Sequence, residues 1–344
     1  MKKKMKILLI GNGLFYHIGA FFRQALEELG YEYYFVDEER FLAPLRYSLI
    51  HKIAYRLLGK RPLTYWALNR EVLNVAQQFR PQIVLIIKGA YIRPETLIFI
   101  KKKINAILVN YATDDPFNPI NSTRDLINSI AFYDLYACTK RAIMDDVKRA
   151  GCPNVVYVPF GYMPSLHFPE KPRTDEEKIR FSSDVVFIGG CDKDRAVIFE
   201  ALIHALPDVQ LALYGGYWNR FPQFRPYYRG FALGRDFRLA LGGAKIALNL
   251  VRKANRDGHV MRTFEIPACG AFMLAERTEE HLEFFEEDKE AVYFSSIDEL
   301  VDKLRYYLHH DNKRVQIAER GYKRVTLNKH TYKDRLQQIL NLLQ

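Results

Sequence analysis

The sequence predicts an α/β protein built from two doubly wound domains, each with a parallel sheet covered by helices on both faces. The chain has 344 residues, more than one ordinary core accommodates, so two domains are expected. Short apolar strands alternate with amphipathic helices, and the apolar strand interiors are typical of a parallel sheet. The pattern breaks once, in a proline-rich charged stretch. We therefore expect a first domain of residues 1–163, a linker of residues 164–181, a second domain of residues 182–328 and a final segment of residues 329–344.

The first domain is expected to hold six strands, with two basic helices between the second and the third. Each predicted strand is a short apolar run that ends in glycine or polar residues. The predicted strands cover residues 6–11, 31–37, 83–88, 106–111, 133–138 and 155–158, and the other predicted helices cover residues 18–29, 94–103, 122–129 and 141–150.

The second domain repeats this architecture with five strands. Ligands of such open sheets bind outside the carboxyl ends of the strands, so two such domains predict a cleft lined by residues that directly follow strands. The predicted strands cover residues 184–188, 210–214, 245–250, 271–275 and 292–294, and the predicted helices cover residues 194–206, 235–241, 257–269, 297–309 and 313–325. A last helix over residues 332–343 is expected in the final segment.

Composition excludes several classes of protein. The chain is 49% hydrophobic and 26% charged, as in soluble globular proteins. The longest apolar run, residues 83–87, ends at Lys88 and is too short to span a bilayer. The basic, apolar start is interrupted by Gly11 and Gly13, which favours a first strand over a signal peptide. The four cysteines are scattered without paired spacing, so we expect a cytoplasmic protein without a zinc site.

The net charge of +11 favours anionic partners. The excess is uneven, because residues 40–61 contain basic residues interleaved with apolar ones and no acid after Arg40. A basic amphipathic helix can lie on an anionic membrane. The alternative is a solvated cationic face on a helix that packs against the core. We expect no nucleic-acid partner.

The most informative segment runs from Asp257 to Glu265 and leads into a small-residue turn and an apolar strand. A carboxylate at such a helix start can accept hydrogen bonds from a diol, and dense polar residues between a buried strand and an apolar helix are costly unless they face a ligand. An Arg262–Glu265 ion pair and an exposed His259 are the structural alternatives. The candidate residues here are Asn249, Asp257, Arg262, Thr263 and Glu265 for binding and His259 for catalysis.

Several glycine turns follow predicted strands. None has the dinucleotide-binding spacing, but glycines let phosphates approach backbone N–H groups at a helix start. Tight turns, aromatic packing and a surface arginine paired with Asp192 or Asp194 are the alternatives. The candidate phosphate- or donor-binding residues are Gly13, Gly189, Gly190, Lys193, Arg195, Gly215, Gly216, Arg229 and Gly230.

Two adjacent carboxylates, Asp114 and Asp115, follow the fourth strand of the first domain. They suit a base, a metal ligand or a group that orients sugar hydroxyls. An ordinary turn before Pro116 is the alternative. Lys88, after the third strand, is a candidate cation on the acceptor side.

Together these segments resemble the CgeB-like (spore maturation protein) branch of the group 1 glycosyltransferases, which have the GT-B fold of two Rossmann-like domains. The resemblance rests most specifically on the stretch around Glu265, together with residues 110–117 and 274–278. These enzymes commonly carry two glutamates separated by seven residues, the second of which holds the donor ribose. Glu265 matches that second position, and Asp257 stands at the first. The resemblance implies that Arg195 or Lys193 neutralises the diphosphate without a metal and that the final helix packs on the first domain.

We therefore expect a glycosyltransferase that moves a sugar from a nucleotide-diphosphate sugar to a glycan, protein or lipid-linked acceptor, with Asp114 or Asp115 as a base or sugar-orienting group. No metal or other cofactor is expected. The rival expectations are a nucleotide-sugar epimerase of the same fold and a non-catalytic carbohydrate-binding coat or surface protein.

Overall fold

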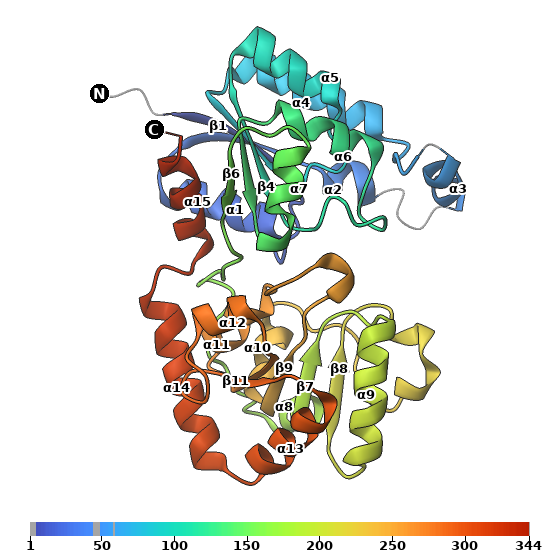
Figure 1. Cartoon of the computed structure of the whole chain (residues 1–344), viewed down its shortest axis with the longest axis vertical. Helices are drawn as coiled ribbons and strands as arrows, with labels where there is room; N and C mark the ends of the chain where they lie inside the picture. Colours follow the sequence, from blue (N-terminus) through green and yellow to red (C-terminus); the bar gives the residue numbers. More distant parts are fainter. Residues whose placement is uncertain (1–4, 44–48, 58, 344) are drawn as a thin grey trace. The chain divides into compact units, whose positions relative to one another are not determined.

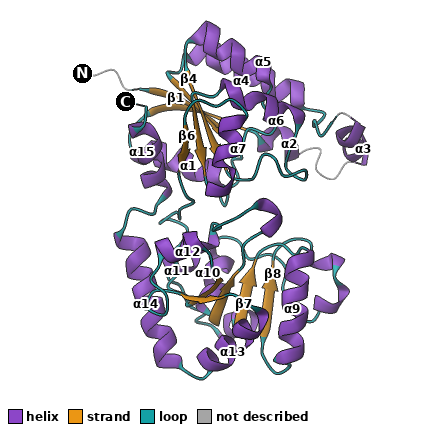
Figure 2. Cartoon of the chain, viewed as in Figure 1, coloured by secondary structure: helices purple, strands orange, loops and turns teal. Residues whose placement is uncertain are grey.

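The computed structural model describes residues 5–43, 49–57 and 59–343, and these form two compact units (Figure 1). Unit 1 comprises the chain up to Pro159, residues 254–256 and the last helix from Tyr332. Unit 2 comprises residues 160–253 and 257–331. Both sheets are parallel throughout, which confirms the predicted fold class of two Rossmann-like α/β domains (Figure 2).

Unit 1 contains a six-stranded sheet in the order β2-β1-β3-β4-β5-β6. Its four central strands are largely buried, and the residues of Ile83–Ile87 are all buried, whereas the two edge strands are partly exposed. The strands are β1 (Lys6–Gly11), β2 (Glu32–Asp37), β3 (Ile83–Ile87), β4 (Ile107–Ala112), β5 (Leu135–Cys138) and β6 (Val155–Tyr157).

The helices of unit 1 differ from the predictions in three places. Three helices, over Glu39–Leu42, Leu49–Leu57 and Tyr65–Phe79, lie between β2 and β3, where two are expected. The helix expected over residues 94–103 is α-helical only to Phe99 and continues as the π-helical turn η2 (Ile100–Ile104). The helix expected over 141–150 starts with a 3-10 turn (Arg141–Ile143). The α-helices are α1 (Ile18–Glu28), α2 (Glu39–Leu42), α3 (Leu49–Leu57), α4 (Tyr65–Phe79), α5 (Pro94–Phe99), α6 (Arg124–Ser129), α7 (Met144–Arg149) and α15 (Tyr332–Asn341).

The last helix closes unit 1 over α1. Tyr332 is fully buried, and its ring packs against Phe21 and Phe22 of α1 at centroid distances of 5.0 and 5.7 Å. Because aromatic rings bury a large apolar area, this contact holds α15 against α1, although the two helices are remote in sequence.

Unit 2 contains a five-stranded sheet in the order β11-β10-β9-β7-β8. The strands are β7 (Ser183–Ile188), β8 (Leu211–Tyr214), β9 (Ala244–Asn249), β10 (Met273–Glu276) and β11 (Val292–Phe294). Its helices are α8 (Asp175–Phe181), α9 (Lys193–Ala205), α10 (Arg235–Gly242), α11 (Arg262–Ala268), α12 (Glu279–Phe284), α13 (Ile297–Leu308) and α14 (Asp311–Leu327).

Helix α8 lies inside the expected linker. Its seven residues show no apolar period, but Thr174 accepts a hydrogen bond from Glu177 N–H while the Glu177 side chain returns to the Thr174 backbone. This capping box satisfies the first backbone donors and starts the helix. None of the helices in the described ranges has both the length and the apolar character needed to cross a bilayer.

Candidate functional site

Three glycine turns of unit 2 meet at the carboxyl ends of β7 and β8. Gly189 N–H donates to Tyr214 O (2.9 Å), and Gly215 N–H donates to Gly230 O (2.8 Å). Gly215 has φ +123°, and a Cβ there would come within 2.4 Å of Gly189 O, so only glycine fits. The structure thus brings together the predicted donor-binding glycines Gly189, Gly190, Gly215, Gly216 and Gly230.

Arg195 stabilises these turns through hydrogen bonds from its buried side chain. Its side chain is buried, and its guanidinium donates to Gly190 O (2.8 Å) and Leu250 O (2.7 Å). Burial lowers the pKa of Arg195 from its usual value. The Arg195 head group thus donates to two backbone carbonyls, and its Nε has no hydrogen-bond partner among the described residues.

Two exposed cations flank the turns. Arg252 Nη2 lies 3.6 Å from the position that a Cβ on Gly190 would occupy, and Lys193 is exposed at the start of α9. Lys193 is one of the binding residues predicted from the sequence, whereas Arg252 is not. The signal for Arg252 was present in the sequence, because it closely follows the strand that ends at Asn249.

Glu265 lies at the same edge of the sheet. Its side chain is buried, with Arg262 paired to Oε2 and His167 Nε2 lying 3.5 Å from Oε1. Arg262 Nε also donates to Ile188 O (3.1 Å), at the end of β7. The ion pair that the sequence left open as the structural alternative is therefore formed, and it places the Glu265 carboxylate beside the glycine turns. His167 was missed because it lies in the expected linker.

Asn249 and Thr263 form a buried network behind this edge. Asn249 Nδ2 donates to Thr263 Oγ1 (3.1 Å), and Thr263 Oγ1 lies 2.9 Å from His281 Nε2. The other ring nitrogen of His281 lies 2.7 Å from the Glu276 carbonyl oxygen, which can only accept. Burial lowers the pKa of His281 to about 4, so the ring is neutral and accepts from Thr263. The network positions the start of α11, and both predicted ligand residues are buried within it.

His259 and Asp257 precede α11 rather than starting it, because the predicted helix over residues 257–269 begins only at Arg262. His259 has no exposed surface; its Nε2 accepts from Phe160 N–H (3.0 Å), and its Nδ1 contacts Glu280. This geometry suits a positioning residue rather than one that touches substrate. Asp257 Oδ2 accepts a hydrogen bond from Arg252 N–H (3.3 Å) and so holds the conformation of the loop that carries Arg252.

Two further predicted residues have structural contacts. Arg229 Nη1 donates to Arg180 O (3.0 Å) and Ser182 O (2.9 Å), which satisfies carbonyls at the end of α8. In unit 1, Gly13 N–H donates to Asp37 Oδ1 (2.8 Å). Phosphate binding at Gly13 is disfavoured, because the Gly13 N–H group already donates to the Asp37 carboxylate, which would also repel a second anion.

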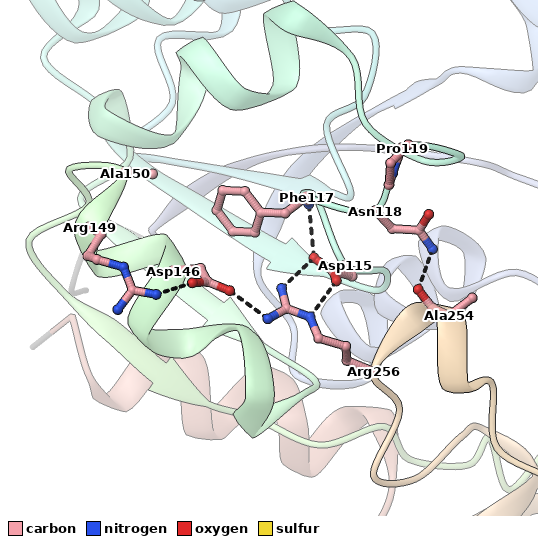
Figure 3. A pocket seen from close by; sticks show the side chains of 9 residues that line it. All are labelled: Asp115, Phe117, Asn118, Pro119, Asp146, Arg149, Ala150, Ala254 and Arg256. Atoms are coloured by element: carbon pink, nitrogen blue, oxygen red, sulfur yellow. Dashed lines mark hydrogen bonds and ion pairs between the residues drawn. The ribbon is translucent and has the colours of Figure 1, made fainter.

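The acidic turn of unit 1 separates its two carboxylates. Asp114 Oδ2 pairs with Lys88 Nζ (2.9 Å), and the Asp114 side chain is 24% exposed. Asp115 is buried and accepts two hydrogen bonds from Arg256, at 2.7 and 3.0 Å, while Arg256 also reaches Asp146 (2.6 Å) (Figure 3). Asp114 is thus the more accessible of the two candidates.

A pocket of about 640 Å³ adjoins this ion-pair cluster. The ring of Phe117 and the side chains of Asp146 and Arg149 are among the groups that line it (Figure 3). An aromatic face beside charged hydrogen-bonding groups suits a polar ring such as a sugar.

Glu38, directly after β2, was not predicted. Its side chain is buried, and its Oε1 has no hydrogen-bond partner among the described residues. Burial raises the pKa of Glu38 to about 7, against the opposing effect of Lys88. The residue gave no sequence signal, because groups that interact with it, such as Lys88, lie far from it in the chain. Within the described ranges, no group of three or more His, Cys, Asp or Glu side chains is placed to hold a metal ion.

Residues 195–341 match the family model described as Glycosyl transferase-like. No curated protein matches the sequence significantly.

Solved structures resemble the chain over nearly its whole length. HepE from Anabaena, solved with UDP and glucose, covers 98% of this chain and 99% of its own at 13% identity, with a TM-score of 0.65. Sucrose-phosphate synthase from Thermosynechococcus elongatus covers 99% of both chains at 12% identity (TM-score 0.70). A putative UDP-N-acetylglucosamine 2-epimerase from Listeria monocytogenes covers 99% and 96% at 11% identity (TM-score 0.58). The chain therefore has the GT-B fold, with its family match in residues 195–341.

Proposed function

We propose that the protein is a glycosyltransferase that takes a sugar from a nucleotide-diphosphate sugar, with the donor bound by unit 2. The observation that carries this proposal is the meeting of the glycine turns with the Glu265 carboxylate at one edge of the sheet. Small residues, cations and a diol-binding carboxylate are the three elements that a sugar nucleotide needs. The Glycosyl transferase-like match over the second half of the chain supports the same reading.

The side chains around the glycine turns of unit 2 bind different parts of the proposed donor. Arg252 and Lys193 neutralise the diphosphate, so that no metal is required. The ring of Tyr217, which is 54% exposed and lies 3.4 Å from the Cβ position of Gly190, stacks on the base. Glu265 accepts hydrogen bonds from the ribose, whose hydroxyls displace Arg262 from Glu265 Oε2.

Unit 1 binds the acceptor. The acceptor hydroxyl attacks the anomeric carbon of the sugar as the bond to the diphosphate breaks, and its proton passes to a base. Asp114 fills that role, oriented by Lys88. The cations of unit 2 stabilise the negative charge on the departing diphosphate. We further propose a cytoplasmic location, because all four cysteines are buried and unpaired.

Titration calorimetry with UDP, GDP and ADP tests donor binding. We expect one of the three to bind the wild-type chain, and its sugar conjugates to raise the melting temperature. If none binds, a non-catalytic carbohydrate-binding role is favoured. Incubation with donor alone separates transfer from epimerisation, the activity named for the Listeria neighbour. Nucleotide release that increases with an added acceptor supports transfer, whereas an epimerised, still activated sugar contradicts it.

A further inference from the structure

Unit 1 presents an exposed apolar face on helix α3. Ile50, Ile53 and Leu57 are 73%, 52% and 80% exposed. They stand at positions i, i+3 and i+7, so they share one side of the helix. A single exposed leucine is common on protein surfaces and needs no explanation. Three large aliphatic side chains on one side of a helix form a contiguous apolar patch, and exposing such a patch to water costs free energy.

The opposite side of α3 faces the protein. Tyr55, five residues after Ile50 and therefore on the other side of the helix, forms a side-chain hydrogen bond with Tyr91. Beyond the helix, Lys60 Nζ donates to Ser122 O (2.9 Å), and Arg61 pairs with Asp125 (2.8 Å). The helix is thus attached through its polar side and the segment that follows it, with the apolar stripe directed outward. In Figure 1, α3 stands apart from the sheet of unit 1.

The segment of chain that carries this stripe is basic in sequence, although Arg61 is paired with Asp125. Residues 40–70 contain seven lysines and arginines and no acid, so they carry +7 of the chain's net +11. Arg40, Arg56 and Arg70 are exposed, whereas Arg46 and the side chain of Lys52 lie outside the described residues. Trp66, at the start of α4, is 58% exposed and lies 4.1 Å from the guanidinium of Arg93. Exposed tryptophan beside arginine is typical of surfaces that meet the lipid headgroup region.

We propose that α3 and the start of α4 form a docking surface for an anionic lipid bilayer. The aliphatic stripe enters the boundary between headgroups and acyl chains, and the arginines remain at the level of the lipid phosphates. Nucleic acid would use the charge but leave the stripe in water. A protein partner would not require an excess of seven positive charges within residues 40–70. The contact is independent of the sugar-transfer chemistry proposed for the chain.

Vesicle co-sedimentation of the full chain tests this proposal. We expect binding to vesicles of phosphatidylglycerol mixed with phosphatidylcholine, weak binding to phosphatidylcholine alone, and loss of binding as salt increases. The triple variant Ile50→Ser/Ile53→Ser/Leu57→Ser is expected to lower the partition coefficient at least about tenfold with an unchanged melting temperature, because the replaced side chains are exposed. Arg56→Glu is expected to weaken binding less.

Exposed aliphatic residues of unit 2 provide a matched control variant, and the fluorescence of Trp66 reports membrane contact. Ile179→Ser/Val315→Ser/Leu327→Ser removes three equally exposed aliphatic side chains from helices of unit 2 and is expected to bind as the wild type does. Of the two tryptophans, Trp218 is buried, so a blue shift of emission on anionic vesicles reports Trp66. Equal binding by the α3 triple variant, equal binding to neutral vesicles, or a stripe buried in a dimer by sedimentation would overturn the proposal. Preferential binding of an oligonucleotide would do the same.

Discussion

His167 Nε2 lies 3.5 Å from Glu265 Oε1 in the interior of unit 2, on the side of the carboxylate opposite Arg262. Burial lowers the pKa of His167 to about 4, so at neutral pH the imidazole is uncharged. The carboxylate is therefore held by one cation and one neutral ring. A carboxylate whose two oxygens are fixed in orientation by different side chains is suited to accept hydroxyl hydrogen bonds.

Replacing Glu265 with alanine is expected to weaken nucleoside diphosphate binding roughly ten- to hundredfold, since a charge-assisted hydrogen bond contributes about 1.5–3 kcal/mol. Titration calorimetry with the nucleotide that binds the wild type measures the effect. Glu319→Ala, on an exposed position of α14, is the matched control. A deoxyribose analogue should show the loss already in the wild type. Unchanged affinity in a folded Glu265→Ala variant would remove the ribose assignment.

Arg252→Ala is expected to lower affinity for the nucleoside diphosphate about tenfold and to leave affinity for the nucleoside nearly unchanged, because the contact is to the diphosphate. Competition titrations with both ligands check this. Arg225→Ala removes another exposed arginine of unit 2 and serves as the control. Equal losses for nucleoside and diphosphate would point to a disturbed fold instead.

The two adjacent carboxylates of unit 1 are expected to differ. Asp114→Asn should lower the turnover of nucleotide release roughly a hundredfold or more, as removal of a general base does. Asp115→Asn should mainly lower the melting temperature, because it breaks the bidentate pair with Arg256. Steady-state kinetics and thermal denaturation of both variants separate the roles. The reverse pattern would transfer the catalytic role to Asp115.

The buried histidines predict a loss of stability in acid. His167 and His281 have folded pKa values of about 4 against an unfolded value near 6.5, so the unfolded chain binds more protons between these pH values. Their contribution is present above pH 6.5 and is lost as the pH falls towards 4, by about 2 kcal/mol for each histidine at pH 5. Urea denaturation at pH 7 and pH 5 measures it. His167→Gln and His281→Gln should each flatten the pH dependence, and an unaltered slope would contradict the assignment.

Glu38 predicts the opposite trend. Its folded pKa of about 7 lies above the unfolded value, so its contribution is greatest below pH 4.5 and is lost as the pH rises through 7. At pH 8 the buried charge costs about 3 kcal/mol as an upper limit. Glu38→Gln should therefore raise the melting temperature at pH 8 more than at pH 5. Asp208→Asn, a substitution on an exposed acid, provides the comparison.

The sequence was informative wherever local pattern determines structure. Apolar runs such as residues 83–87, bounded by turn residues, favour buried strands, and glycines that follow such runs, such as Gly189 and Gly215, are expected at the strand ends. What local pattern could not predict is which polar atoms meet. Arg195 reaches the carbonyl of Leu250, and Arg229 reaches the end of a helix that itself depends on a capping box.

The same limit applies to the acids. The motif that contains Glu265 was recognisable, but its partner His167 comes from a stretch without periodicity. Asp114 and Asp115 are chemically identical in sequence and are distinguished by their partners, such as Lys88 for Asp114 and Arg256 for Asp115, which lie far away in the chain. Burial of Glu38 depends on packing that no local window contains.

Neither unit is a continuous stretch of chain. The polypeptide passes from one to the other at four places, and Tyr332, from the last of these passages, fills the core beside α1. A gene fragment that ends at residue 159 would thus encode a sheet whose α1 layer lacks its aromatic cover. Recombination between homologues can exchange the halves only if the terminal helix travels with the opening segment. The two ends of the gene should accordingly be inherited together, even where the middle is replaced.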